Sequence, residues 1–184
     1  MIVEEREYAR LLGYPWGTLL EGDVRGRAEE AAAWFEAHGR PRVYCVTTPA
    51  PGNFGIPNSE IPAHVTITAI TAGSEADTEV ERLWEAGCVD EAYFLDRYAV
   101  AVVEKLAADL GADRRPGTGG IPFEEQWTLF EYIKPLNPEI EMLPSGMLKP
   151  KNSLLAVVPF DAETLPNPCV RCGMPDCSYR RTTA

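Results

Sequence analysis

The residues best suited to chemistry lie near the C-terminus, where three of the five cysteines fall within nine residues. Cys169, Cys172 and Cys177 have the spacing C-x2-C-x4-C. Two thiolates separated by two residues can grip one ion from a tight turn, and the third cysteine can close the same loop. A closed zinc site takes four ligands and an iron–sulfur cluster usually takes four thiolates, so the set is one ligand short of either. The pattern favours an iron–sulfur cluster over zinc, and a tail without metal is the third interpretation.

The two remaining cysteines are candidates for the fourth ligand. Cys45 lies in a β-branched strand pattern, and Cys88 lies at the end of a helical pattern. A metal site left open to solvent or to a partner is the alternative to both. Clustered thiols in the cytoplasm more often bind metal or do chemistry than form disulfides, and the odd number of cysteines agrees with this.

A glycine-rich stretch, "RRPGTGGIP" over 114–122, is the second candidate site. Gly117 and Gly119 permit close approach of backbone to a ligand, and Arg115 offers a fork of donors to a carboxylate. The spacing fits neither a dinucleotide-binding fingerprint nor a phosphate-binding P-loop. A sharp turn between two helices is the simpler interpretation of these glycines.

Composition limits the class of protein. The formal net charge of −11 argues against binding to nucleic acid and fits a charged, soluble protein or one with a locally basic partner. No run of residues approaches the roughly 18 apolar positions that a membrane helix needs. The acidic, amphipathic N-terminus is unlike a secretory signal. We therefore expect a cytoplasmic protein without membrane contact.

The elements that must position these residues mix helices and strands without regular alternation. The longest helical pattern has a middle, "YAVAVVEKLA", that is apolar nearly all round, which predicts a buried central helix. The expected fold class is α+β, with an antiparallel or mixed sheet packed on that helix. We expect a core over 1–162 and a cysteine-rich metal-binding tail over 163–184. Helices are predicted over 4–12, 24–37, 73–87, 90–111 and 123–133, and strands over 42–48, 64–71 and, with an interruption, 139–160.

The aromatic side chains are predicted to be buried, because aromatic residues dominate burial in cores. This expectation covers two groups: Trp34, Phe35 and Trp84 on the inner faces of two helices, and Phe123, Trp127, Phe130 and Tyr132 around the glycine-rich loop.

Four stretches, taken in order, resemble the activation domain of cobalamin-dependent methionine synthase and its small stand-alone relatives. They are "YARLLGY", "DEAYFLDRYAVAVVEKLAADL", "RPGTGG" and "MLPSGMLKPKNSLLAVVPF". Together they span most of residues 4–160. The cysteine tail lies outside the methionine synthase domain but is similar to the tails of some stand-alone relatives.

The resemblance implies an S-adenosylmethionine site in which Arg115 pairs with the methionine carboxylate, with Gly117, Gly119 and Glu104 beside it. It also implies a partner, a corrinoid protein or methyltransferase that carries cobalamin. In the family, an electron and a methyl group from S-adenosylmethionine restore methylcobalamin from inactive cob(II)alamin. The chain departs from the family where the loop tyrosine is replaced by Gly120 and a glutamate by Ser145.

These features suggest a corrinoid-linked accessory protein. On the first hypothesis, an iron–sulfur cluster in the tail supplies the electron for reductive activation of, or electron transfer to, a cobalamin-dependent methyltransferase system. On the second, the chain is a non-catalytic module that docks on a corrinoid protein and is held together by a structural zinc. On the third, it is an S-adenosylmethionine-binding reactivation protein.

Overall fold

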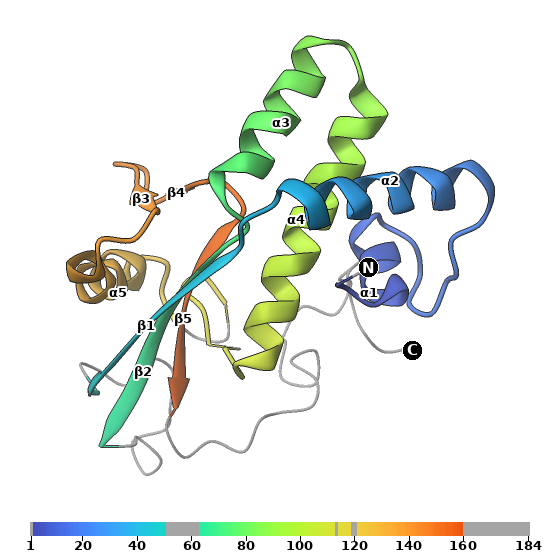
Figure 1. The fold of residues 1–184 in the computed structure, drawn as a ribbon. Helices are drawn as coiled ribbons and strands as arrows, with labels where there is room; N and C mark the ends of the chain where they lie inside the picture. Colours follow the sequence, from blue (N-terminus) through green and yellow to red (C-terminus); the bar gives the residue numbers. More distant parts are fainter. Residues whose placement is uncertain (1, 51–62, 113, 119–120, 160–184) are drawn as a thin grey trace.

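The computed structural model describes residues 2–50, 63–112, 114–118 and 121–159 (Figure 1). The tail cysteines Cys169, Cys172 and Cys177 lie outside these residues, as does Gly119. The boundary predicted between 162 and 163 also lies outside them, so the tail and its metal stay a prediction.

A three-stranded antiparallel sheet is at the centre of the fold. Its strands are β1 (Arg42–Pro49), β2 (His64–Thr71) and β5 (Ser153–Pro159), in the order β1-β2-β5. These segments are rich in Val, Ile and Thr, whose branched side chains suit a pleated, half-buried surface. The predicted strands are thus confirmed, and the sheet is antiparallel throughout.

The described part of the chain contains five α-helices, and they correspond to the five predicted helices. They are α1 (Glu5–Leu11), α2 (Gly22–His38), α3 (Ser74–Glu85), α4 (Val89–Asp109) and α5 (Glu125–Ile133), with a short 3-10 helix over Lys134–Leu136. A separate hairpin pairs β3 (Glu141–Met142) with β4 (Leu148–Lys149). We predicted an interrupted strand over 139–160, and the structure has this hairpin followed by β5 in that range.

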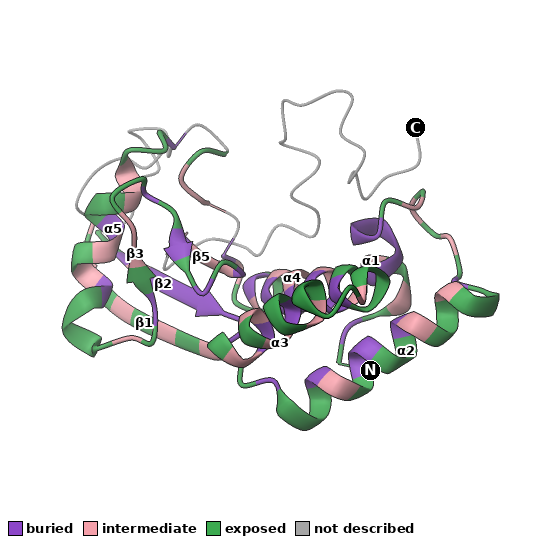
Figure 2. Cartoon of the chain, turned by 90° about the horizontal axis from the view of Figure 1, so that it is seen from above, coloured by how far each residue is buried: buried purple, intermediate pink, exposed green. Residues whose placement is uncertain are grey.

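The long helix α4 is the centre of the larger core, as predicted. Leu95, Tyr98 and Val102 are almost fully buried on it, and α1, α2 and α3 pack around it. The Tyr98 ring meets the edges of Tyr8 and Phe35, with centroids 5.1 and 5.6 Å apart. Figure 2 shows the buried residues concentrated on α4 and β2. Edge-to-face pairs of this kind fix how helices from distant parts of the chain pack.

A second core lies on the other face of the sheet. Ile67 of β2 and Leu155 of β5 pack there with Leu129 and Ile133 of α5. The strands therefore run between α5 on one side and α4 on the other (Figure 1). This arrangement confirms the α+β class and brings the segment between α4 and α5 past the edge of the sheet.

Buried Asp96 anchors the segment that leads into β5. Its carboxylate accepts hydrogen bonds from Lys151 Nζ at 2.7 Å, from Asn152 Nδ2 at 3.2 Å and from the neighbouring Arg97 guanidinium. Burial opposes ionisation of Asp96, but these donors outweigh it and hold the pKa below its ordinary value. The network fixes the start of β5 against α4.

Several aromatic residues are more exposed than predicted. Phe35 is buried, but Trp34 is only half-buried and Trp84 is 50% exposed. Around the glycine-rich loop, Phe130 and Tyr132 are half-buried, whereas Phe123 and Trp127 are 39% and 37% exposed. The prediction was wrong for Trp84, Phe123 and Trp127. Trp84 lies in the last turn of α3, beyond the part of that helix that is buried, and Phe123 precedes α5. Trp127 lies on α5 away from its buried stripe.

Among the residues that the structure describes, no helix combines the length and the apolar character needed to cross a bilayer.

Candidate functional site

The glycine-rich loop begins with a sharp reversal at the end of α4. Gly111, at φ +66°, donates from its N–H to Ala108 O at 3.1 Å, and Ala112 donates to Ala107 O at 2.8 Å. This pair of bonds is the Schellman motif, in which a residue in the left-handed region ends a helix. Ala112 is buried beneath the turn. The reversal directs the following residues back along α4.

The loop next runs along the free edge of β5. The carbonyl of Arg114 accepts a hydrogen bond from Val157 N–H at 2.8 Å, which forms an isolated antiparallel bridge. The backbone that leads into Arg115 is therefore held by α4 and by the sheet.

Arg115 and Glu104 form a two-pronged ion pair. Arg115 Nη1 donates to Glu104 Oε1 at 2.6 Å, and Nη2 donates to Oε2 at 3.1 Å. Arg115 Nε donates to Ala112 O at 3.2 Å, so the guanidinium is fixed on three sides. About a quarter of each side chain stays exposed. The two side chains are paired, held in one orientation and partly exposed to solvent. They therefore present a positive and a negative charge side by side.

The tip of the loop is a closed turn. Thr118 N–H and Oγ1 both donate to Arg115 O, at 3.1 and 3.0 Å, and Ile121 N–H donates to Thr118 O at 3.0 Å. Gly117 adopts φ +79° and donates to Ile121 O at 2.9 Å. The Gly117 N–H is therefore hydrogen-bonded within the turn. Gly117 permits the turn conformation and does not offer its N–H to a ligand.

An exposed aromatic pair borders this loop. The rings of Phe123 and Trp127 meet edge to face, with centroids 5.6 Å apart and planes at 87°. A Cβ on Gly117 would lie 3.7 Å from Phe123 Cδ2, which places the Phe123 ring next to the loop. The arrangement presents apolar aromatic surface beside the turn at Gly117.

The turn between β3 and β4 closes on the same aromatic pair. Gly146, at φ +84°, is so close that a Cβ there would lie 2.5 Å from Trp127 Cη2 and 2.9 Å from Phe123 Cε1. Gln126 Nε2 donates to Gly146 O, and Leu143 N–H donates to Met147 O at 2.8 Å. The segments "RPGTGG" and "LPSG", far apart in the sequence, thus meet through Phe123 and Trp127.

The predicted ligand residues are partly brought together. Arg115, Glu104 and Gly117 lie at one site. Cys45 is exposed on β1, where its thiol donates to Thr68 Oγ1 at 3.4 Å, and Cys88 is half-buried before α4. Neither forms a disulfide, and the described part of the chain contains no group of three or more His, Cys, Asp or Glu side chains arranged to hold a metal.

Sequence reasoning missed Phe123, Trp127 and Gly146 as parts of the site. The spacing of apolar residues in α5 could have indicated that Trp127 is exposed. Leu129 and Ile133, four residues apart, define the buried stripe, and Trp127 lies about 200° around the helix from Leu129. For Gly146, the residue type indicates a turn and nothing more, because its contact with the site depends on the Phe123 and Trp127 rings from another part of the chain.

No protein-family model matches the sequence, and no curated protein matches it. Nine chains of solved structures match the fold. One of them is the crystal structure of the MetH reactivation domain bound to AdoHcy, at a TM-score of 0.65 and 12% identity. The match covers 89% of this chain and 76% of that domain, so this chain has the fold of that reactivation domain.

Proposed function

We propose that this chain is an accessory protein that reactivates a corrinoid-dependent enzyme and binds S-adenosylmethionine beside Arg115. The observation that carries the proposal is the Arg115–Glu104 pair, held at the surface between α4 and β5. The shared fold with a domain crystallised with AdoHcy supports it.

The pair suits the amino-acid end of such a ligand, which carries a carboxylate and an ammonium group on one carbon. Arg115 donates once from each of its three nitrogens in the bonds described, and a guanidinium has five N–H groups. Two donors therefore remain for a ligand carboxylate. Glu104 supplies the negative charge that an ammonium group seeks, so one ion pair can bind a zwitterion.

The aromatic pair suits the other end of the ligand. Bases and nucleosides stack on aromatic side chains irrespective of their hydrogen-bonding pattern. Phe123 and Trp127 expose more than a third of their surface beside the loop. They offer a platform for adenine that does not require the tyrosine which Gly120 replaces.

When bound, S-adenosylmethionine supplies a methyl group, which together with one electron converts cob(II)alamin on the partner to methylcobalamin. This chain's residues would hold the methionine end at Arg115 and Glu104 and leave the partner, a corrinoid protein or methyltransferase, to present the cobalt. The fold likeness to the MetH reactivation domain supports such a partner.

Isothermal titration of the full chain with S-adenosylmethionine tests the proposal. We expect saturable binding that weakens by about 10–100-fold in Arg115→Ala, because a charge-assisted, two-pronged contact is lost. Arg25→Ala, which removes an exposed arginine of α2 that pairs with Glu29, is the matched control and should bind like wild type. Absence of heat up to millimolar ligand in the wild type would refute the proposal.

We propose as a second function that the tail over 163–184 carries an iron–sulfur cluster that supplies the electron. The C-x2-C-x4-C spacing of Cys169, Cys172 and Cys177 supports it. Anaerobic purification with iron, sulfide and zinc quantified together should give a brown, iron-containing protein, and Cys172→Ser should lose the metal. A colourless protein with stoichiometric zinc after iron reconstitution would instead support the docking module with a structural zinc.

The fourth ligand is tested in the same preparation. If Cys45 or Cys88 completes the site, the corresponding serine variant will lose iron while the other keeps it. Retention of iron in both variants would assign the fourth position to solvent or to the partner.

A further inference from the structure

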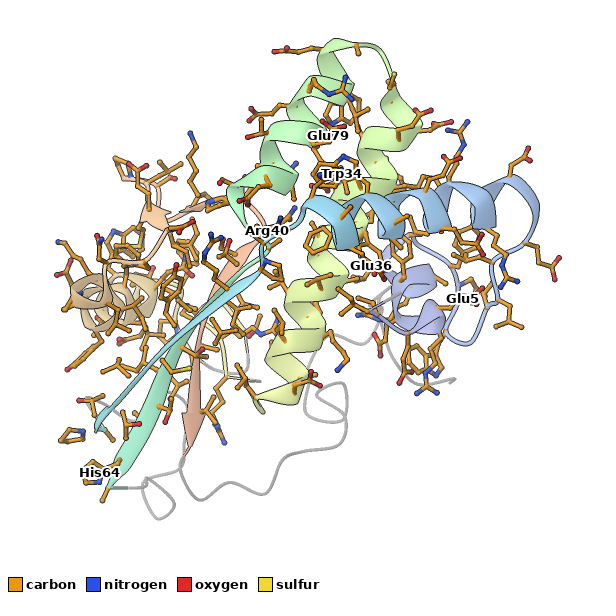
Figure 3. The ribbon with its side chains drawn as sticks, viewed as in Figure 1. Glu5, Trp34, Glu36, Arg40, His64 and Glu79 are labelled. Atoms are coloured by element: carbon orange, nitrogen blue, oxygen red, sulfur yellow. The ribbon has the colours of Figure 1, made fainter. Side chains whose placement is uncertain are left out.

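A pocket of about 170 Å³ lies between α2, α3 and α4. Its floor is apolar and is made by Ala31 and Trp34 of α2, Leu83 of α3 and Leu95 of α4. Its rim is charged and is made by Arg27, Glu30, Glu79 and Glu91. Figure 3 shows Trp34 and Glu79 where α2 passes α3. The loop of Arg115 contributes nothing to this lining.

The charge at the rim is unbalanced. Arg27 is engaged by two carboxylates, with Nη1 at 3.2 Å from Glu91 Oε1 and Nη2 at 3.3 Å from Asp90 Oδ2. Glu79 is paired with Arg82, at 2.7 and 2.8 Å. Glu30, exposed at the mouth, makes no ion pair among the residues that the structure describes. The rim therefore carries negative charge in excess of its positive charge.

The half-buried indole of Trp34 adds a second attraction for cations. The face of a tryptophan is the aromatic surface that binds cations best, and guanidinium groups also stack on it. An apolar floor, an indole and surplus carboxylates together suit a group with an apolar stem and a charged head.

The size of the pocket sets the occupant. Cofactor and drug sites usually span about 300–1,000 Å³, whereas a cavity of about 150 Å³ holds a benzene-sized group. This pocket therefore has room for one side chain and not for a nucleoside.

The hairpin of α3 and α4 projects from the body at the top of Figure 1, and Trp84 and Val89 at its end are 50% and 47% exposed. An exposed tryptophan at the end of a projecting hairpin is typical of protein interfaces, in which aromatic residues are enriched.

We propose that this pocket receives an arginine side chain from a partner protein. The apolar stem packs on Ala31, Leu83 and Leu95, the guanidinium lies over Trp34, and Glu30 meets it at the mouth. The net charge of −11 agrees with a basic partner surface. This inference does not depend on S-adenosylmethionine binding.

The test uses the ¹⁵N-labelled full chain and N-acetyl-arginine methylamide, with the uncharged citrulline analogue as the control probe. The indole N–H resonance of Trp34, identified through Trp34→Phe, should shift saturably with the arginine probe and stay unmoved by citrulline. Glu30→Gln should weaken the affinity by about two- to five-fold, as expected for one exposed charge pair. Glu81→Gln removes an exposed glutamate of α3 that does not line the pocket, so it should bind like wild type.

Three results would each overturn the proposal. They are an unmoved indole resonance at saturating probe, equal shifts with citrulline, and unchanged affinity in Glu30→Gln. Both glutamates are exposed, so neither substitution is expected to unfold the chain.

Discussion

Gly146→Ala tests how tightly the β3–β4 turn closes on the aromatic pair. The new methyl group would lie 2.5 Å from Trp127 Cη2, about 1 Å inside the roughly 3.5–4.0 Å at which carbon atoms meet. The backbone at φ +84° also disfavours any side chain, by about 1–2 kcal/mol. Alanine recovers about 0.4–1 kcal/mol by stiffening the unfolded chain. If Trp127 moves aside, the edge-to-face contact, about 0.5–1.5 kcal/mol, is lost.

These terms sum to a net loss of about 0.5–3 kcal/mol in the free energy of unfolding. Urea denaturation followed by circular dichroism gives this value directly. Repeating the substitution in a Trp127→Ala background removes the closest contact, so the cost should fall by about 1 kcal/mol, measured as the coupling energy of a double-mutant cycle. An equal cost in both backgrounds, or a cost below about 0.5 kcal/mol in the wild type, would refute the geometry described for this turn.

Three further outcomes follow from the polar contacts. Asp96→Asn should lower the free energy of unfolding by about 1.5–3 kcal/mol, measured by urea denaturation, because charged donors lose their acceptor. Since the pKa of Asp96 is lowered on folding, its stabilisation is complete at neutral pH and is lost as pH falls below about 4, so wild type and Asp96→Asn should converge in stability in acid. Glu104→Gln should weaken S-adenosylmethionine binding about five- to ten-fold by calorimetry, and unchanged affinity would remove Glu104 from the site.

The strands and the long central helix could be predicted because their patterns are unambiguous. β1 and β2 are rich in Val, Ile and Thr, and the middle of α4 is apolar on nearly every side. Arg115 could be nominated as a ligand residue from its type and its glycine-rich setting. Its pairing with Glu104 depends on the reversal at Gly111, which returns the chain alongside α4.

The aromatic residues mark the limit of sequence reasoning. The apolar content of Phe123 and Trp127 predicted burial, but what covers a side chain is decided by the packing of other elements. α5 buries Leu129 and Ile133 against the sheet, and among the described residues the turn at Gly146 is the segment that comes closest to the Trp127 ring on the other side of the helix. The exposed pair therefore becomes apparent only once β3 and β4 are placed.

The most direct measurement compares S-adenosylmethionine with its decarboxylated analogue by calorimetry, in the wild type and in Arg115→Ala. If Arg115 holds the methionine carboxylate, the wild type will prefer the complete ligand by about 10–100-fold. Arg115→Ala will bind the two ligands equally. Equal binding by the wild type, or the same preference in Arg115→Ala, would contradict the assignment of this site.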